Sequence, residues 1–349
     1  MKNSIYNYDQ EALEEYFLSI GDKKYRAVQI LEWLYRKRVD SFEEMTNLSK
    51  LAKQDLIENF TIEPLTLEKK LCASDGTIKY LFKLEDGHLI ETVLMRHNYG
   101  NSVCVTSQVG CNMGCSFCAS GELGKVRDLD LSEMMRQVLY VQKELDKTTE
   151  RVTNVVVMGI GEPFDNYDTV IKFVKTLNYG KGFEIGARHI TISTCGIVPK
   201  IKAFKDENLQ VNLAISLHAP NNELRSQIMK INKAYPLEEV MAAAKEYVEA
   251  TNRRITFEYI LLEGINDTKK CAYELINLIR GMNAYVNLIP YNKVVTKSYR
   301  QTSHDQGEKF FSILYEAGIN VTMRMEHGND INAACGQLRA QELSKKGEA

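Results

Sequence analysis

Apolar and polar residues are distributed differently along different parts of the chain. From about residue 100 onward, short apolar runs rich in β-branched residues alternate with longer stretches in which apolar residues recur every three or four positions. The short runs are typical of buried strands, and the longer stretches are typical of amphipathic helices. Regular alternation of the two predicts an α/β fold with a parallel sheet and crossover helices.

This alternation predicts strands at 102–106, 153–158, 189–193, 211–216, 255–261, 285–289 and 319–324. Helices are predicted between them, at 132–145, 167–177, 237–250, 270–279 and 308–317. Six strand–helix units suit a partial (β/α)6 barrel. Because such barrels place their chemistry at the carboxyl ends of the strands, polar residues that directly follow a strand are candidates for the functional site.

The chain before the barrel is predicted to form two smaller parts. Residues 1–60 are expected to be a helical accessory domain with a small core of its own. Residues 61–100 are expected to be a short β-rich connecting segment with turns at Asp75-Gly76 and Asp86-Gly87, and residues 101–349 form the α/β core and its C-terminal segment. The apolar positions that indicate the N-terminal core are Leu13, Tyr16, Phe17, Ile30, Trp33 and Leu34.

The formal net charge of −2 gives the 349-residue chain no overall attraction to nucleic acid or anionic lipid. RNA binding would therefore depend on local patches, and one candidate lies between Gly21 and Arg38. Six basic residues there outnumber two acidic ones, with Tyr25, Trp33 and Tyr35 interleaved. Such a patch suits RNA phosphates and bases, although a solvated helix face has the same composition. The basic residues are Lys23, Lys24, Arg26, Arg36, Lys37 and Arg38.

No apolar run approaches the ~20 residues that a membrane-spanning helix needs. The chain begins with Met-Lys-Asn-Ser and shows no apolar signal segment. These features predict a cytoplasmic protein in a reducing compartment, which argues against a disulfide framework for its eight cysteines.

Three cysteines in one short run, Cys111, Cys115 and Cys118, are the strongest chemical signal in the chain. Their spacing lets one loop fold its thiolates around a single [4Fe–4S] cluster, and Gly110 and Gly114 leave the backbone free to wrap it. Three protein ligands leave one iron open for chemistry. A structural zinc site would instead expect four closed ligands, usually as two separated pairs, and an electron-transfer cluster would need a fourth ligand.

The Cys-x3-Cys-x2-Cys run, with Phe117 before its last cysteine, resembles the signature of radical S-adenosylmethionine (SAM) enzymes. This resemblance implies that the amino and carboxylate groups of SAM occupy the open iron. The segment Gly161-Glu162-Pro163 follows the second predicted strand and resembles the Gly-Glu-Pro motif of these enzymes, which holds the amino group of SAM. Taken alone, a glycine turn after a strand is most often only a tight turn.

Other polar residues end or follow later strands. Ser193 ends the third predicted strand, Ser216-Leu217-His218 the fourth, and Asn292 follows the sixth. We expect these residues to face the barrel mouth and to bind SAM together with Gly161 and Glu162. The alternative is that the serines cap helices and that His218 is a satisfied core imidazole.

Cys335 stands in Ala334-Cys335-Gly336-Gln337-Leu338, and Cys104 precedes the first cluster cysteine by seven residues. Together with the Ser-Leu-His and Leu-Ile-Pro-Tyr-Asn segments, they resemble the RlmN/Cfr family of radical SAM RNA methyltransferases, from about residue 91 to residue 338. The resemblance implies that Cys335 becomes an S-methylcysteine intermediate and that two molecules of SAM are used per turnover. It further implies that Glu91 is the proton acceptor, and that Cys104 releases the RNA by forming a transient disulfide with Cys335.

Without the resemblance, Glu91 and Cys104 have simpler interpretations. Glu91 lies in an alternating β pattern, where a single glutamate usually points to solvent. Cys104 in an apolar strand would be a small buried hydrophobic residue. The remaining cysteines, Cys72, Cys195 and Cys271, are expected to be structural.

The resemblance implies as substrate an adenosine in the peptidyl transferase centre of 23S rRNA and, for RlmN members, one beside the tRNA anticodon, both methylated at carbon 2. Cfr members methylate carbon 8 of the rRNA adenosine. Residues 161–163 and 214–220 match RlmN forms, whereas departures at Ser120-Gly121-Glu122, Lys230 and Asn332 leave the substrate open. The family also implies a one-electron reductant such as flavodoxin or ferredoxin, and a monomer. An iron–sulfur or zinc-bearing RNA-binding protein without methyltransferase activity is the alternative.

Overall fold

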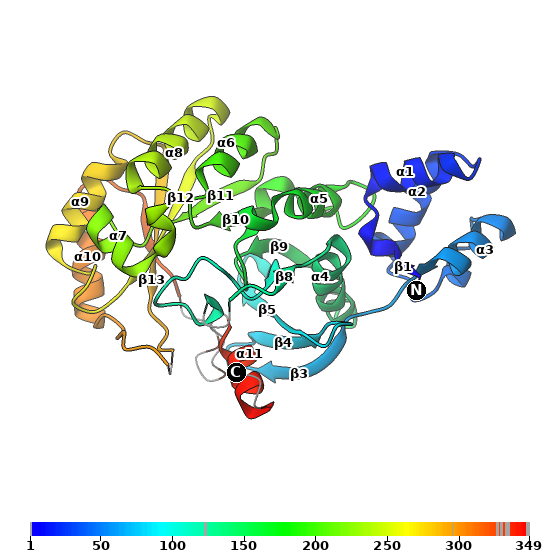
Figure 1. Cartoon of the computed structure of the whole chain (residues 1–349), viewed down its shortest axis with the longest axis horizontal. Helices are drawn as coiled ribbons and strands as arrows, with labels where there is room; N and C mark the ends of the chain where they lie inside the picture. The colour runs from blue at the N-terminus through cyan, green and yellow to red at the C-terminus, as the bar shows by residue number, and fades with distance from the viewer. Residues whose placement is uncertain are drawn as a thin grey trace.

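A computed structural model describes residues 2–121, 124–294, 296–325, 328, 331 and 336–346 of the chain. Its central feature is a ten-stranded sheet with the order β14-β13-β12-β11-β10-β9-β6-β5-β4-β3. Figure 1 shows helices α1 to α3 at one end of the molecule and helices α9 and α10 at the other. The functional site lies along the sheet between them.

Seven strands of the sheet run parallel, from β6 to β14. The predicted strands of the barrel are therefore confirmed, with boundaries that differ by a few residues. Because the seven strands run in the same direction, their carboxyl ends all meet at one edge of the sheet. The strands are β6 (Gly100–Cys104), β9 (Val152–Val157), β10 (Ile190–Thr194), β11 (Asn212–Ser216), β12 (Ile255–Leu261), β13 (Ala284–Pro290) and β14 (Val321–Met323).

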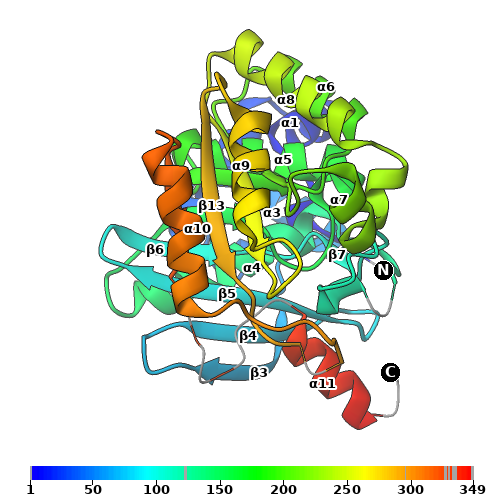
Figure 2. The same ribbon diagram turned by 90° about the vertical axis from the view of Figure 1, so that its left-hand side faces the viewer.

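Crossover helices connect these strands, and Figures 1 and 2 show α8, α9 and α10 on the outer side of the sheet. The five predicted helices are confirmed as α4 (Leu131–Asp146), α5 (Tyr167–Asn178), α8 (Leu237–Thr251), α9 (Lys269–Ile279) and α10 (His304–Glu316). A capping box begins α4, where the Asp130 carboxylate accepts the Glu133 N–H at 2.7 Å. Two short helices, α6 (Val198–Asp206) and α7 (Asn222–Ile228), were not predicted because they show too few turns for a clear apolar period.

Three antiparallel strands extend the same sheet beyond β6. They are β3 (Thr66–Cys72), β4 (Ile78–Lys83) and β5 (Leu89–His97), and β5 joins the parallel strands by pairing Val93 with Cys104. Both predicted turns are confirmed: Gly76 and Gly87 adopt φ values of +81° and +88°, which only glycine adopts without strain. The β-rich segment is thus continuous with the sheet of the core.

The N-terminal region contains α1 (Gln10–Ser19), α2 (Tyr25–Leu31), a π-helical segment (Glu32–Lys37) and α3 (Lys50–Asn59), with β1 (Asn3–Ser4) paired to β2 (Phe60–Thr61). Its helical character is confirmed, but the expectation of a separate core is wrong. The N-terminal apolar residues belong to the same buried cluster as the sheet and its helices. Tyr35 explains this continuity, because its ring packs 5.9 Å from Tyr6 and 5.5 Å from Phe183 of the core.

Short elements complete the described chain. The strands β7 (Gln108–Val109) and β8 (Arg127–Asp128) pair antiparallel and close the loop that carries the three cysteines. A 3-10 turn, η4 (Ala119–Gly121), follows the last of them, and helix α11 (Gln337–Lys346) lies against β5 and η4. Within the described ranges, none of the helices is both long enough and apolar enough to span a bilayer.

Candidate active site

The cysteine loop is held in a tight conformation by its glycines. Gly110 has a φ of +82°, and a Cβ atom there would lie 1.8 Å from the carbonyl oxygen of Gly124. The Cys111 N–H donates to that same carbonyl at 3.2 Å, and the Cys118 N–H donates to the Cys115 carbonyl at 3.1 Å. The backbone freedom expected at this loop is therefore used to bring its two ends together.

The thiols of Cys111, Cys115 and Cys118 line one cavity of about 220 Å³ at the carboxyl ends of the parallel strands. Burial, with a smaller contribution from neighbouring thiols, raises the pKa of Cys111 to about 12 and raises the pKa of Cys115 as well. A metal centre would therefore have to displace protons on binding.

In the part of the chain that the structure describes, no three His, Cys, Asp or Glu side chains already converge on a single-ion position. The donor set nevertheless fits a cluster, because three thiols around a common cavity are the ligands that a [4Fe–4S] group with one open iron requires. Lys230, one of the departures from the family pattern, packs its side chain on this loop, 2.9 Å from the Cβ position of Gly114.

The Gly-Glu-Pro segment lies across the same cavity and fits closely against β6 and the residues after it. A Cβ atom at Gly159 would approach the Val105 carbonyl to 2.6 Å, and one at Gly161 would approach the Gln108 side chain to 2.7 Å. The Glu162 carboxylate is 4% exposed and accepts the Phe164 N–H at 3.0 Å and the Cys195 N–H at 2.8 Å. Its burial raises the pKa of Glu162, so the ionised carboxylate lacks full compensation.

Ser193 and Ser216 end neighbouring strands, and their hydroxyl oxygens lie 3.3 Å apart on the wall of the cavity. His218 also lines the cavity, while its Nδ1 accepts the Ile260 N–H at 3.1 Å. Burial and the nearby Arg225 lower the pKa of His218 to about 3, so its imidazole is neutral. The imidazole is thus satisfied by the core and also forms part of the cavity wall. Leu217 is fully buried, and its N–H donates to the Glu258 carbonyl at 3.0 Å.

A second cavity, of about 280 Å³, adjoins the first and shares Phe117, Cys118, Met158 and His218 with it. Cys104 and Asn292 lie on this second cavity. The structure therefore brings Cys104 next to the cysteine loop, and it puts Asn292 on the adjoining cavity rather than among the residues that line the thiol cavity.

Glu91 is 3% exposed, so the interpretation that it points to solvent is wrong. Its carboxylate lies 2.9 Å from Nζ of Lys79, a fully buried lysine on β4. It also accepts the backbone N–H groups of Gly336 at 2.8 Å and of Arg339 at 2.6 Å. Glu91 is buried because α11 covers this part of the sheet, with Leu338 packed against Leu81 and Leu89.

Cys335 itself lies outside the described residues, as do Asn332 and Glu122. Gly336, the next residue in the chain, lies between the Glu91 carboxylate and the cysteine loop, since a Cβ atom on it would meet the Ser120 hydroxyl at 2.7 Å. No disulfide joins two cysteines among the described residues. The expected transient disulfide of Cys104 with Cys335 involves a residue outside them and stays a prediction.

Several residues around the site were not found from the sequence. Arg225 is fully buried and donates to the carbonyls of Cys195 at 2.6 Å and Leu217 at 3.3 Å, which joins the ends of β10 and β11. Cys195, expected to be structural, lines the thiol cavity. Buried charges such as Arg225 and Lys79 give no sequence signal, because their partners are distant in the chain or are backbone groups.

The N-terminal basic patch is partly engaged in internal ion pairs. Arg38 pairs with Asp146 at 2.6 Å, and Arg36 approaches Glu184 to 3.9 Å, so both reach towards the core. Arg26 pairs with Asp22 at 3.3 Å, and Lys37 lies 3.3 Å above the Trp33 ring. Lys23 is exposed, and Lys24, whose side chain is 64% exposed, lies 3.8 Å from Glu14.

Comparison with known proteins supports the resemblance to radical SAM RNA methyltransferases that the sequence motifs indicate. Residues 105–276 match the radical SAM superfamily, and residues 3–62 match the ribosomal RNA large subunit methyltransferase N-terminal domain. A probable dual-specificity RNA methyltransferase RlmN of Spiroplasma citri is 56% identical over 338 residues, which cover 97% of either chain. The Bacillus subtilis protein of the same name is 53% identical and is covered to 93%, over 97% of this chain.

Among solved structures, a radical SAM methyltransferase from Sphaerobacter thermophilus superimposes with a TM-score of 0.91 at 43% identity, covering 96% of this chain and 98% of that one. This match confirms the predicted fold class. Membership of the superfamily implies a [4Fe–4S] cluster and SAM. The chain belongs to the RlmN family of radical SAM RNA methyltransferases.

Proposed function

We propose that this protein methylates carbon 2 of an adenosine in the peptidyl transferase centre of 23S rRNA and of an adenosine beside the tRNA anticodon. The observation that carries the proposal is the contact of Glu91 with Gly336 at 2.8 Å. Through it, a buried carboxylate stands beside the residue that follows Cys335, where a base is needed if Cys335 carries the methyl group. The RNA substrate follows from the relatives, which are named dual-specificity RNA methyltransferases.

Carbon 2 of adenine is electron-poor and cannot attack the methyl sulfonium of SAM, so a polar displacement by the base is closed. The Cys335 thiolate is a strong nucleophile and takes the methyl group from a first SAM, forming the sulfur–carbon bond as the sulfonium bond breaks. Cys111, Cys115 and Cys118 would hold a [4Fe–4S] cluster, which would supply the electron for the cleavage of a second SAM. The three thiols line one cavity together with Gly161, Glu162, Ser193, Ser216 and His218, and Asn292 lines the adjoining cavity.

The SAM contacts in this proposal are Gly161, Glu162, Ser193, Ser216, Leu217, His218 and Asn292. Glu162 is suited to bind the amino group of SAM, because the hydrogen bonds that its buried carboxylate accepts come from neutral donors among the described residues. A cationic ammonium supplies the missing compensation. Leu217 can contribute only through its backbone, since its side chain is in the core.

The 5′-deoxyadenosyl radical from this cleavage would take a hydrogen atom from the methyl group on Cys335 and leave as 5′-deoxyadenosine, and the methylene radical would add to carbon 2 of adenine. The adduct then gives up the carbon 2 proton, and its extra electron would return to the oxidised cluster, so no external oxidant is needed. Glu91 receives the proton. Cys104 then attacks the Cys335 sulfur: the new sulfur–sulfur bond forms, the sulfur–carbon bond breaks, and the released carbon takes up a proton. Cys104 pairs across the sheet with Val93, two residues from Glu91, so both side chains lie on one face of adjacent strands.

A one-electron donor of the flavodoxin or ferredoxin type is required, and we propose that the enzyme acts as a monomer. The test is anaerobic reconstitution with iron and sulfide, followed by reductant, SAM and protein-free rRNA or tRNA, and mass spectrometry of the digested nucleosides. We expect 2-methyladenosine together with 5′-deoxyadenosine. Appearance of 8-methyladenosine would instead assign Cfr-type chemistry, and a protein with zinc and no 5′-deoxyadenosine would contradict the proposal.

The role of Cys104 has its own test. Cys104→Ala should still methylate Cys335 but stall as a covalent RNA adduct, visible as a protein band shifted by nuclease-sensitive mass. Cys72→Ala is the matched control, because Cys72 is exposed on β3. Free methylated RNA released by Cys104→Ala at the normal rate would show that another group resolves the adduct.

A further inference from the structure

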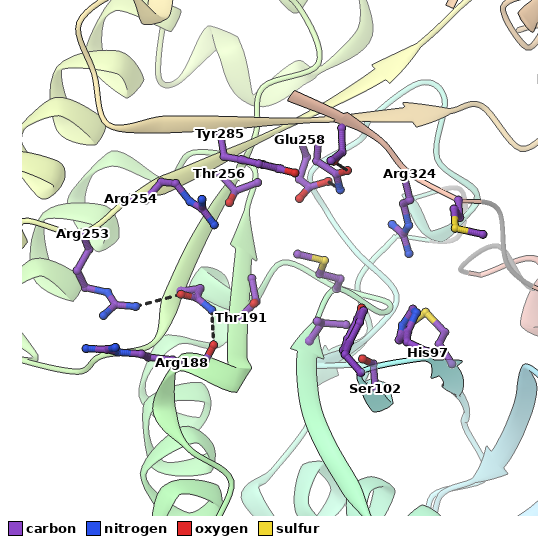
Figure 3. A pocket seen from close by; sticks show the side chains of 18 of the residues that line it. His97, Ser102, Arg188, Thr191, Arg253, Arg254, Thr256, Glu258, Tyr285 and Arg324 are labelled. Carbon is purple, nitrogen blue, oxygen red and sulfur yellow. Dashed lines mark hydrogen bonds between the residues drawn. The ribbon is translucent and has the colours of Figure 1, made fainter. Parts of the chain in front are cut away.

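The interior of the barrel continues beyond the site as a third and larger cavity of about 980 Å³ (Figure 3). It shares Met158 and Arg324 with both cavities of the site, so the three spaces adjoin. Its far end is formed at the amino ends of β10 to β13, by Arg188, Asn212, Arg253, Arg254 and Asn283. The cavity thus extends from the catalytic residues to the opposite edge of the parallel sheet.

The charge of this cavity is strongly one-sided. Four arginines line it, at positions 188, 253, 254 and 324, whereas Glu258 is its only carboxylate among the described lining residues. Burial raises the pKa of Glu258, while the charge of Arg324 and a hydrogen bond from Asn287 act to lower it. Among the described residues, Arg188, Arg253 and Arg254 have no carboxylate within 4.0 Å, and Arg324 interacts with Glu258 only at longer range. A protein of net charge −2 therefore concentrates positive charge at this surface.

Neutral groups hold the Arg253 and Arg254 guanidinium groups in place instead, and Arg188 joins the same network through its backbone carbonyl. Arg253 donates to the Asn212 side-chain oxygen at 3.0 Å, and the Asn212 amide donates to the Arg188 carbonyl at 2.7 Å, as Figure 3 shows. The Arg254 guanidinium lies 4.7 Å from the centre of the Tyr285 ring. Such contacts orient a guanidinium without neutralising it, so its charge stays available to an external anion.

Aromatic rings stand at the rim of the same cavity. His97 and Tyr99 lie on its lining, stacked 4.6 Å apart, and Tyr99 is 71% exposed. Exposed rings beside a basic groove are the combination that binds single-stranded nucleic acid, because bases stack on the rings while arginines follow the phosphates.

We propose that this arginine-lined cavity, defined by Arg188, Arg253, Arg254 and Arg324, binds the phosphates of the RNA strand adjoining the target adenosine. The inference rests on the proposed function for the identity of the RNA. Arg188 lies five positions before Ser193, at the opposite end of β10, and the strand residues Ile190 to Ser193 alone span about 10 Å at ~3.3 Å per residue. The flank must therefore be single-stranded and reach several nucleotides past the target base. A spread of four arginines over this length suits a polynucleotide better than one small anion.

The test measures binding separately from turnover, with the full-length protein carrying its cluster. Fluorescence anisotropy is recorded for labelled RNA oligonucleotides in which each flank of the target adenosine is shortened by one nucleotide at a time. The variants are Arg254→Gln and Arg188→Gln, both at exposed positions, and Lys245→Gln on the outer helix α8 is the control. Thermal melting confirms that each variant is folded.

We expect each arginine variant to raise the Kd several-fold for the long oligonucleotide and to lower the slope of log Kd against log salt by about 0.7. Shortening the flank that occupies the cavity should weaken binding to the unmodified protein. The same shortening should weaken binding to the arginine variants only slightly, because the substitution and the shortening remove the same contacts. Lys245→Gln should bind as the unmodified protein does.

Equal Kd values for variants and unmodified protein, or full additivity of the variants with shortening, would overturn the inference while leaving the proposed function intact. If inorganic triphosphate bound in an arginine-dependent way without displacing RNA, the cavity would be a small-anion site and the inference would again fail. If no RNA bound to the unmodified protein, the proposed function would fail first.

Discussion

Glu162 and Glu91 stand on two sides of the same barrel interior and are buried to a similar degree, at 4% and 3% exposure. Their surroundings differ. Glu162 accepts backbone N–H groups and has no cation beside it, whereas Glu91 faces the ammonium group of Lys79 as well as two N–H groups. The comparison teaches that burial alone does not decide the role of a carboxylate. A buried carboxylate without a neighbouring cation suits a cationic ligand, whereas one that is paired with a lysine can hold other segments of the protein in place.

The strongest test of this comparison removes a ligand of the expected cluster near Glu162 and leaves Glu91 and its partners unchanged. Cys115→Ala should abolish SAM cleavage and methylation, because two thiolates do not hold the cluster. Iron analysis and the visible absorption of the reconstituted protein measure this loss, with Cys72→Ala as the control at an exposed thiol. Protection of α11 amides from hydrogen exchange should persist in Cys115→Ala. Exposure of α11 in that variant would show that the two sides are not independent.

Removing the cation beside Glu91 should have the next largest effect. Lys79→Met leaves a buried carboxylate without its charged partner, which should lower the free energy of unfolding by about 3–5 kcal/mol. The double variant Lys79→Met/Glu91→Leu should regain most of this stability but no methylation. Denaturant unfolding and the nucleoside assay provide the two measurements.

A more exposed ion pair, between β3 and α4, shows what exposure does to such an effect. Lys70 pairs with Glu144 where their side chains are 33% and 23% exposed. Lys70→Met should therefore cost only about 0–1 kcal/mol. If Lys70→Met and Lys79→Met were equally destabilising, the compensation attributed to Lys79 would have to be abandoned.

The raised pKa of Glu162 predicts a pH dependence of stability. Between the ordinary pKa of 4.5 and the higher value in the folded protein, the folded state keeps a proton that the unfolded state has released. Stability therefore falls as pH rises through this window and stays lowered above it. Glu162→Gln removes the titrating group, so its stability relative to the unmodified protein should improve with rising pH. Denaturant midpoints without SAM measure the difference, and a constant offset at every pH would contradict the assignment.

The smallest effect is expected at the N-terminal patch. Arg36 lies 3.9 Å from Glu184, with both side chains largely exposed, so Arg36→Gln should change the free energy of unfolding by less than about 0.5 kcal/mol. The same variant can be compared with the arginine variants of the cavity. Because Arg36 contributes little to stability, any loss of RNA affinity in Arg36→Gln would come from a lost phosphate contact. Anisotropy with tRNA measures it, and a large loss of stability would mean that Arg36 is a structural residue.

Features that depend on neighbouring residues could be predicted from the sequence. The parallel strands, the cysteine loop and the turns at Gly76 and Gly87 each carry a local signal, because apolar period, thiol spacing and positive φ are properties of a few adjacent residues. The placement of Gly161, Ser193 and Ser216 around one cavity also followed, since parallel strands end at one edge.

Features that depend on distant partners could not be predicted. The Glu91 carboxylate accepts the N–H groups of Gly336 and Arg339, which are more than 240 positions away in the chain. In the same way, Tyr35 joined two apolar clusters that the sequence pattern separates. The arginine-lined cavity was not predicted because its arginines lie at the ends of three different strands, β10, β12 and β14, with no common spacing in the sequence.

The Glu91 carboxylate holds the backbone of Gly336 and Arg339 by accepting their N–H groups. Bonds to an ionised acceptor are about twice as strong as bonds to a neutral one. In the proposed reaction, the carboxylate loses its charge at the moment when it takes the proton from adenine. The hydrogen bonds from Gly336 and Arg339 to Glu91 therefore weaken just when the Cys335 sulfur must meet Cys104. A single proton transfer would act as both a chemical step and a release signal, setting the order of events without a separate moving lid.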